Sequence, residues 1–129
     1  MVLVDSSVWI EYLGTRESEV CIKMDELLKP NNRVVITGII FQEILQGIRD
    51  PHSFEFVRKR LSQLPIILPT PDTHLRAAEI FRKLVSKGKT PSTIDVYLAA
   101  LALEHGVLLF TLDRDFHRIA DEFPLRLFR

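Results

Sequence analysis

Five carboxylates in four distant parts of the chain follow short apolar runs or lie in helical stretches. Asp5 follows the apolar residues VLV, and Asp113 and Asp115 stand shortly after VLLF. Glu43 lies within TGIIFQEILQG, and Asp95 lies within TPSTIDVYLAALAL. In a parallel α/β sheet, ligands and reacting groups gather beyond the carboxyl ends of the strands. If the chain folds in this way, these acids share one small space.

Carboxylates crowded in this way have a chemical consequence. Like charges repel and raise one another's pKa. A divalent cation is the usual reason for a protein to tolerate them, and Mg²⁺ and Mn²⁺ prefer such oxygen ligands. A divalent cation stabilises the negative charge that builds up in phosphodiester hydrolysis, and it lowers the pKa of a bound water. The pattern therefore indicates a metal-dependent nuclease.

Each acid also has a purely structural interpretation. Asp5 could cap the helix that follows it, and Asp95 could favour a helix dipole from the first turn. Asp113 and Asp115 could be ordinary turn formers, and Asp115 could simply cap the last helix. Glu43 could be a solvated helical residue. The combination favours function for four of them, with Asp115 the weaker candidate.

Small residues near the acids carry further expectations. Gly47 stands one turn after Glu43, and a glycine in a helix interior costs roughly 1 kcal/mol relative to alanine. Either room for a metal or RNA beside Glu43 or close helix packing would explain that cost. Ser7 and Thr111 are small hydroxyls near the carboxylates. They are expected to orient the carboxylates or a metal-bound water.

Length and composition are those of an ordinary globular protein. The 129 residues are expected to form one domain over residues 1–129, long enough for a proper core. Cys21 is the single cysteine, which excludes an internal disulfide and fits a reducing compartment such as the cytoplasm. We expect neither a signal peptide nor a membrane span. The balance of Lys+Arg 17 and Asp+Glu 17 argues mildly against a strongly basic nucleic-acid surface.

Strand-like and helix-like segments alternate along the chain. Short apolar runs predict strands at 2–4, 34–36, 66–68, 107–110 and 125–128. Helical spacing and cap residues predict helices at about 6–13, 18–28, 37–48, 51–64, 72–87, 92–105 and 116–121. Asn31 and Asn32 are expected to end the second helix. The helix from 72 is expected to turn inward Leu75, Ala78, Phe81 and Val85. This alternation indicates an α/β fold with a parallel sheet covered on both faces.

Four motifs resemble, in order along the whole chain, those of the PIN domain. They are DSSVWIEYL from residue 5, EILQG from residue 43, IDVYLAALA from residue 94 and TLDRDF from residue 111. The chain length and the residues of these motifs are most similar to those of the VapC-like ribonuclease toxins of type II toxin–antitoxin systems. The resemblance implies a three-layer PIN-like fold with about five parallel strands. It also implies an Mg²⁺- or Mn²⁺-dependent endoribonuclease, a homodimer, and an antitoxin that blocks the site.

The resemblance also assigns roles to residues. The acidic quartet of the family falls on Asp5, Glu43, Asp95 and Asp113. In that assignment Asp5, Asp95 and Asp113 ligate the metal, while Glu43 holds a second metal or orients the attacking water. Ile94 departs from the family, which often carries a small or amide residue there. We expect no loss of chemistry from that departure.

RNA must still reach an acidic site. Arg49, Arg114 and Arg118 lie near the ends of the elements that carry the acids, so they are candidate contacts for the RNA backbone. The run from Arg58 to Arg60 is interpreted instead as a solvated helix face.

Two other classes of protein remain open. A phosphoryl-transfer domain, such as a response receiver or a haloacid-dehalogenase-type phosphatase, also has an aspartate after its first strand. The phosphatase pattern requires a second aspartate two residues later, where this chain has Ser7. Both classes require a lysine after a late strand, and none follows Phe110–Leu112 or Leu125–Phe128. A non-catalytic PIN-like binding module is the other class, which the intact acids disfavour.

Overall fold

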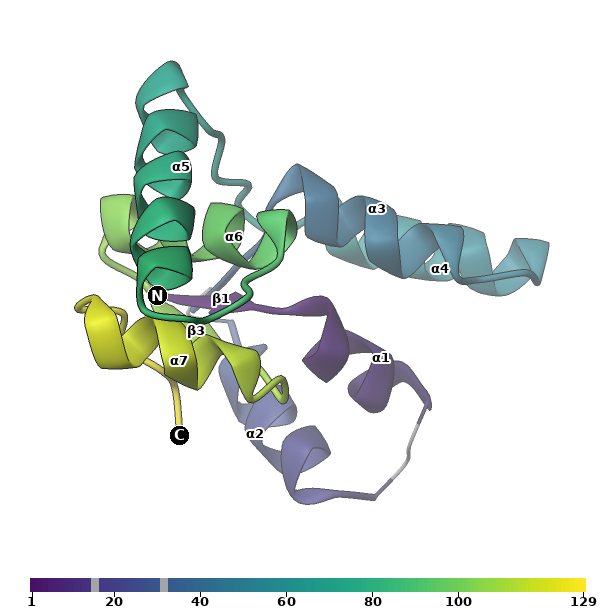
Figure 1. Ribbon diagram of the computed structural model, residues 1–129. Helices are drawn as coiled ribbons and strands as arrows, with labels where there is room; N and C mark the ends of the chain where they lie inside the picture. Colours follow the sequence, from purple (N-terminus) through teal and green to yellow (C-terminus); the bar gives the residue numbers. More distant parts are fainter. Residues whose placement is uncertain (15–16, 31–32) are drawn as a thin grey trace.

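A parallel sheet forms the centre of the computed structural model, which describes residues 1–14, 17–30 and 33–129 (Figure 1). The strands are β1 (Val2–Val4), β2 (Val34–Val35) and β3 (Leu108–Phe110). They lie in the order β2-β1-β3, and both pairings are parallel. Every residue of β1 is buried. Apolar residues at every position are typical of a parallel strand that is covered on both faces.

One further segment pairs with each edge of this sheet through a single parallel bridge. Ile66 bridges to Ile36, just beyond the end of β2, and Leu127 bridges to Leu109 in β3. Prolines adjoin both segments, and a proline has no N–H to donate to a ladder, which keeps the additions short. The predicted five parallel segments are thus present in the described chain, three as strands and two as bridges.

Seven helices surround the sheet in the described part of the chain. They are α1 (Ser6–Gly14), α2 (Glu19–Leu27), α3 (Gly38–Gln46), α4 (Pro51–Leu61), α5 (Pro71–Ser86), α6 (Thr93–His105) and α7 (Asp115–Glu122). Three begin at predicted caps, where the side chains of Thr37, Asp50 and Ser92 each accept a hydrogen bond from a backbone N–H three residues on. The predicted stop at Asn31 and Asn32 lies outside the described residues.

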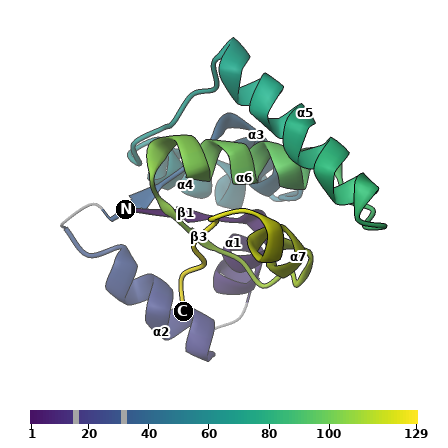
Figure 2. The ribbon, with the colours of Figure 1, turned by 60° about the vertical axis from the view of Figure 1, so that its left-hand side comes forward.

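The helices fall into two packed groups. α6 packs on α5 and α7, whereas α1 packs on α2 and α3, and α3 packs on α4. Figure 2 shows α5 and α6 on one side of β1 and β3, with α2 on the other. The pair α3 and α4 extends away from the sheet (Figure 1). The predicted α/β architecture with helices on both faces is confirmed. Among the described helices, none has the length and apolar character needed to cross a membrane.

The central helix α6 holds one of the acids in a fixed place. Val96 and Leu98 to Ala102 are all buried, and a helix that is apolar all round belongs in a core. Gly106 ends the helix with φ of 62°, in the left-handed region that glycine adopts without steric cost. The chain then enters β3 directly. Asp95 therefore lies on the first turn of a helix that the core holds firmly.

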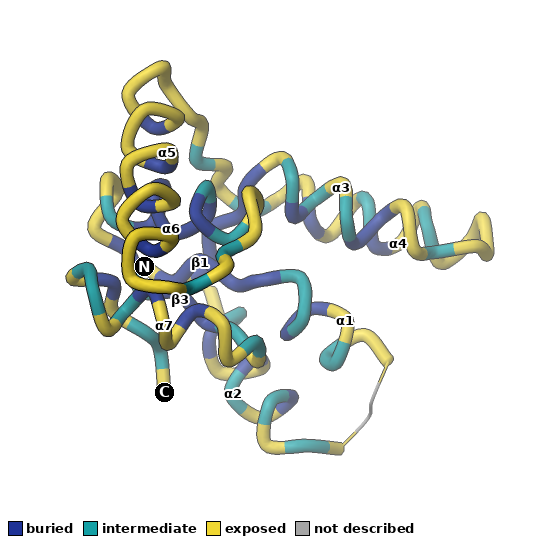
Figure 3. The backbone as a smooth tube through the Cα atoms, viewed as in Figure 1, coloured by how far each residue is buried: buried dark blue, intermediate teal, exposed yellow. Residues whose placement is uncertain are grey.

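The predicted inward face of α5 is wrong. Leu75 and Val85 are exposed by 62% and 50%, and the buried face carries Thr73, Ala77, Ile80 and Leu84. Figure 3 shows this helix exposed along its outer side and buried along the side toward α6. Both stripes have helical spacing, and α5 packs mainly against one neighbour. The stripe of Thr73, Ala77, Ile80 and Leu84 is therefore the buried one, and the predicted stripe faces outward.

Candidate functional site

Asp5 lies at the carboxyl end of the central strand and is buried. It is 6% exposed, and its backbone N–H donates to the carbonyl of Phe110 at 2.8 Å. Its carboxylate accepts from the backbone N–H of Ser6 at 2.8 Å on Oδ1. The hydroxyls of Ser7 and Thr111 donate to Oδ2 at 2.8 and 2.9 Å. Three hydrogen bonds to the charged form therefore compensate the burial of this carboxylate.

The same two hydroxyls join the loops that follow β1 and β3. Ser7 Oγ accepts from the backbone N–H of Leu112 at 3.1 Å, and Thr111 Oγ1 accepts from that of Asp113 at 3.0 Å. Both hydroxyls donate to Asp5; Ser7 accepts from the loop after β3, whereas Thr111 accepts from within its own loop. This arrangement fixes the position of Asp113 relative to Asp5. The expected orienting role of Ser7 and Thr111 agrees with these contacts.

Three other carboxylates form a cluster beside Asp5. Oxygen atoms of Asp95, Asp113 and Asp115 all lie within 4.8 Å of one another. Asp95 comes from the first turn of α6, and Asp113 comes from the turn after β3. Asp113 Oδ1 accepts from the backbone N–H of Asp115 at 2.9 Å, which turns the chain into α7. Asp95 and Asp113 are half-buried, whereas Asp115 is exposed.

Asp115 is the residue whose place the sequence interpretation undervalued. It opens α7, as a cap-like residue should, yet its carboxylate also joins the cluster. The signal in the sequence is the spacing of two between Asp113 and Asp115. A turn that is closed by the first aspartate brings the second to the same side of the chain. A structural role and a place in the site are therefore compatible.

Crowding alters the acid strength of Asp95. The pKa of this carboxyl is raised to about 6: burial is the largest cause and the charges of Asp113, Asp5 and Asp115 add to it, while a hydrogen bond with Ser92 opposes them. The carboxylate is therefore ionised at neutral pH only against a cost. A bound cation would remove that cost.

Glu43 lies on α3, close enough for the charge of Asp5 to act on it. Burial raises the pKa of Glu43, the charge of Asp5 raises it further, and a hydrogen bond from the Ser6 side chain lowers it. Glu43 does not belong to the group of three described carboxylates. The charge of Asp5 thus acts on both Glu43 and Asp95. The catalytic roles of the four predicted acids remain predictions.

The expected role of Gly47 is wrong. Helix α3 ends at Gln46, so Gly47 is its C-cap with φ of −85° and carries no helix-interior cost. A Cβ at Gly47 would meet only the carbonyls of Ile44 and Glu43, at the ordinary distances of 3.6 and 3.8 Å. This glycine therefore requires neither a ligand nor close helix packing to explain it.

The donor chemistry of the site fits a hard divalent cation. The cluster offers only carboxylate oxygens, and hydroxyls lie next to it at Ser7 and Thr111. Carboxylate oxygens are the ligands that Mg²⁺ and Mn²⁺ prefer, and soft sulfur ligands are not needed. The residues present therefore fit a metal ion of this class.

Comparisons with known proteins agree with this geometry. The model of the PIN domain matches residues 2–122. The chain belongs to the PIN-domain family. It is 32% identical over 123 residues to the VapC ribonuclease Mb1587 of Mycobacterium bovis. The matched segment covers 93% of this chain and 92% of that relative.

Two solved structures of PIN proteins show the same fold. VapBC2 from Rickettsia felis bound to a DNA fragment from their promoter has a TM-score of 0.80 at 21% identity, over 99% of this chain and 98% of that one. A toxin–antitoxin complex from Klebsiella pneumoniae has a TM-score of 0.73 at 21% identity, over 88% of each chain. The PIN-like fold expected from the sequence is therefore confirmed.

The crowding of Asp95 predicts a stability effect with a defined pH dependence. A raised pKa means that the folded state binds the proton more tightly than the unfolded chain. Ionisation therefore destabilises the fold as pH rises from about 4 through about 6. In chelator, Asp95→Asn should melt higher than the wild type at about pH 7.5, and the difference should vanish near pH 4. Thermal melting across this range measures it.

Asp72→Asn is the matched control for this measurement. Asp72 also lies on a first helical turn, that of α5, but it is exposed and outside the cluster. This variant should not gain stability, because it loses a favourable interaction with the helix dipole. If Asp95→Asn melts below the wild type at every pH, the carboxylates are not crowded in solution.

Proposed function

We propose that this protein is a metal-dependent endoribonuclease that hydrolyses RNA phosphodiester bonds and acts as the toxin of a toxin–antitoxin pair. One observation carries the proposal. The buried Asp5 and the cluster of Asp95, Asp113 and Asp115 meet at the carboxyl end of the sheet in a PIN-family chain. The 32% identity to a VapC ribonuclease supports RNA as the substrate.

In this proposal Asp5, Asp95 and Asp113 hold Mg²⁺ or Mn²⁺, with Asp115 as an additional oxygen donor. The cation supplies charge stabilisation at the phosphoryl oxygens and a water of lowered pKa. A carboxylate has about four acceptor positions, and Asp5 uses two on Oδ2 and one on Oδ1. Its remaining acceptor position is on Oδ1, so Asp5 would hold the cation through that oxygen.

Glu43 has a different role from the other acids. Its pKa is raised by burial and by the charge of Asp5, which makes this carboxylate a better proton acceptor. We assign Glu43 to orienting the attacking water and accepting its proton, or to holding a second cation. Ser7 and Thr111 keep the Asp5 carboxylate in place while these steps occur, because both donate to it.

The alternative classes fit the site less well. A phosphatase of the aspartyl type would need an acid where Ser7 stands, and the Ser7 hydroxyl is engaged with Asp5 and the backbone of Leu112. A non-catalytic binding module would have no use for four acids held at the cost of raised pKa values at Glu43 and Asp95. RNA hydrolysis accounts for all of them.

The proposal predicts RNA cleavage that depends on both the metal and the acids. The purified protein, free of antitoxin, should cleave RNA with Mg²⁺ or Mn²⁺ and stop in chelator. Asp5→Asn and Asp95→Asn should each lower the cleavage rate by more than about 100-fold. Removing a residue that only supports a metal ligand costs up to about 100-fold, and removing a ligand itself should cost more. Gel analysis of labelled RNA measures this. Glu17→Gln, an exposed acid elsewhere, should cleave normally. Cleavage that persists in excess chelator would refute the metal mechanism.

We also propose where the antitoxin binds. Helices α1, α2 and α4 enclose an open hollow of about 570 Å³. Its lining includes Trp9, Leu28 and Leu64, and it also includes Leu13 and Phe56, which are exposed by 45% and 62%. Exposed apolar side chains around a hollow mark an interaction surface. An apolar segment of the antitoxin is the occupant we propose, because the fold is shared with a toxin–antitoxin complex.

This assignment predicts that binding and catalysis can be separated. Phe56→Asp should weaken antitoxin binding by at least about 10-fold, since a charge would enter an apolar contact, and RNA cleavage should be unchanged. Phe81→Asp puts the same charge on an exposed phenylalanine of α5, outside the hollow, and should bind normally. Calorimetry with the antitoxin measures both. Wild-type affinity in Phe56→Asp would place the antitoxin elsewhere.

A second copy of this chain, forming a homodimer, is the remaining partner that we propose. Zero formal net charge removes one barrier to self-association. Ile66, Leu68 and Leu75 are large apolar side chains that are more than half exposed in the isolated chain. They lie before and on α5, outside the hollow that we assign to the antitoxin. A second copy of the chain would cover them.

A further inference from the structure

Two arginines adjoin the acidic cluster on α7. Arg114 stands between Asp113 and Asp115 in the sequence and is the N-cap residue of α7, with helical φ and ψ of −67° and −17°. Arg118 follows four residues later, so both side chains lie on the same face of the helix. Both are exposed. Arg118 also lines a small hollow together with Asp95 and Asp115. The two cations are thus the nearest neighbours of the cluster along this helix.

These arginines have no ion-pair partner in the described part of the chain. Ion pairs within 4 Å there join Lys23 to Glu19, Lys29 to Glu26, Arg58 to Glu55 and Lys89 to Glu122. Like charges four residues apart on a helix are mildly destabilising. The pair of arginines therefore carries a cost in the free protein that an anion on this face would remove.

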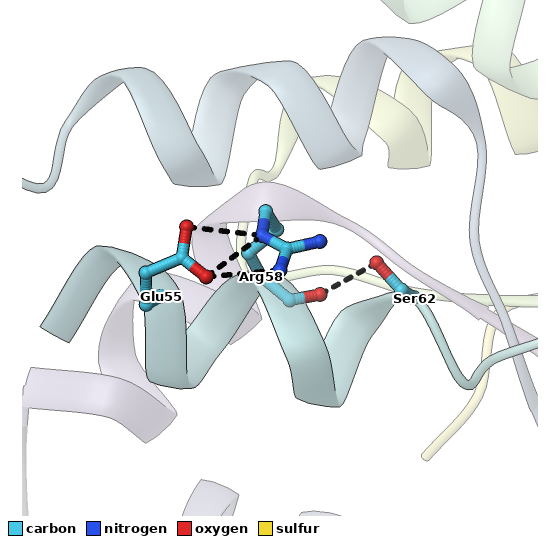
Figure 4. Close-up of polar contacts among 3 residues, drawn as sticks. All are labelled: Glu55, Arg58 and Ser62. Carbon is cyan, nitrogen blue, oxygen red and sulfur yellow. Dashed lines mark hydrogen bonds and ion pairs between the residues drawn. The ribbon is translucent and has the colours of Figure 1, made fainter. Parts of the chain in front are cut away.

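Three other basic residues, Lys89, Arg58 and Arg60, already have partners. The ammonium of Lys89 donates to the carbonyl of Arg118 at 3.3 Å and lies 3.6 Å from Glu122, which ties the loop before α6 to α7. Figure 4 shows Arg58 paired with Glu55 on α4, with Arg58 Nη2 2.9 Å from Glu55 Oε2. Arg60 lies 5.3 Å from the ring centre of Phe56. Arg58 and Arg60 of the α4 run thus have partners on their own helix.

An acidic nuclease site needs cations close by. Three carboxylates and one divalent cation still leave a net negative charge, which repels an RNA strand. Charges are screened beyond about 8 Å at physiological ionic strength, so compensation must come from groups next to the cluster. Guanidinium groups match phosphate geometry, because they donate two parallel hydrogen bonds to it. Arg114 and Arg118 have the required place, charge and exposure.

We propose that Arg114 and Arg118 bind the RNA backbone beside the cleaved bond, so that the strand leaves the acidic cluster across the exposed face of α7. This assignment rests on the proposed ribonuclease activity. It makes the two arginines binding residues that hold the phosphates flanking the reacting one. Arg49, the third candidate from the sequence, does not line the hollow that contains Asp95 and Asp115.

The test is the salt dependence of RNA cleavage by the double variant Arg114→Ala/Arg118→Ala. A mixed-sequence single-stranded RNA would be cleaved with Mn²⁺ from about 50 to about 300 mM KCl, with KM and kcat measured separately. Each phosphate contact contributes about 0.7 to the slope of log affinity against log salt for a single strand. Because two contacts are removed, the slope of log KM against log salt should be smaller by about 1.4 in the variant. Its KM should rise on the order of 10-fold near physiological salt, with kcat unchanged.

Two further variants separate charge from structure. Arg114→Lys/Arg118→Lys keeps both charges and should restore most of the wild-type slope. Lys59→Ala/Arg60→Ala removes the same charge from α4, which lies on the other side of the molecule from α7 in Figure 1, and should keep the wild-type slope and KM.

Several results would overturn the assignment. One is a wild-type slope in the double alanine variant, and another is a loss confined to kcat. If the double alanine variant cleaved RNA with normal kinetics but bound the antitoxin more weakly, the two arginines would be contacts for the antitoxin and not for RNA. These results differ from failure of the proposed function, in which the wild-type protein itself would cleave no RNA with Mn²⁺.

Discussion

Repulsion among carboxylates at one end of a parallel sheet is the constraint on which the rest of this structure depends. The register sets Val4 beside Phe110, so the loops after β1 and β3 must run side by side. Asp5 begins one loop and Asp113 follows in the other. The hydroxyls of Ser7 and Thr111 compensate for this proximity by donating to Asp5. Ser7 also accepts from Leu112 in the opposite loop, and Thr111 accepts from Asp113 in its own loop. The acids are thus held together by neutral donors.

Rigid packing behind the site maintains this arrangement. Helix α6 is buried on most sides, so Asp95 cannot move away from Asp113 without disturbing the core. Glu43 is carried by α3, which the buried residues Ile40 and Ile44 anchor in the core, and the charge of Asp5 acts on it. The pKa values of Asp95 and Glu43 are raised first by burial and then by the neighbouring carboxylate charges, and they record the cost of holding these groups here. A site of this kind trades stability for a place where a cation binds strongly.

Much of the fold could be predicted from the sequence because local and global signals agree. Apolar runs mark the strands, and Thr37, Asp50 and Ser92 begin helices where the sequence places them. The meeting of distant acids follows from one rule, that parallel strands bring their carboxyl ends to the same edge. Their metal-binding and catalytic roles remain proposals.

The failures have physical causes as well. The inward face of α5 depends on which stripe meets α6, and periodicity alone fits both stripes. Gly47 marks the end of α3, and its role was misjudged because helix ends are hard to place from sequence. A cap residue and a cluster member look alike in sequence, which is why the sequence alone ranks Asp115 low. Its place in the cluster depends on the turn that Asp113 closes, a tertiary feature.

The central claim is that these acids form a cation site, and a crystal structure of the antitoxin-free protein grown with Mn²⁺ tests it most directly. Anomalous scattering locates manganese independently of any assumption about its ligands. We predict a peak at about 2.0–2.3 Å from oxygens of Asp95 and Asp113, with Asp5 Oδ1 in direct or water-mediated contact. That peak should be absent in crystals of Asp95→Asn grown in the same way. An ordered cluster with no manganese at saturating Mn²⁺, or manganese bound only elsewhere, would contradict the account.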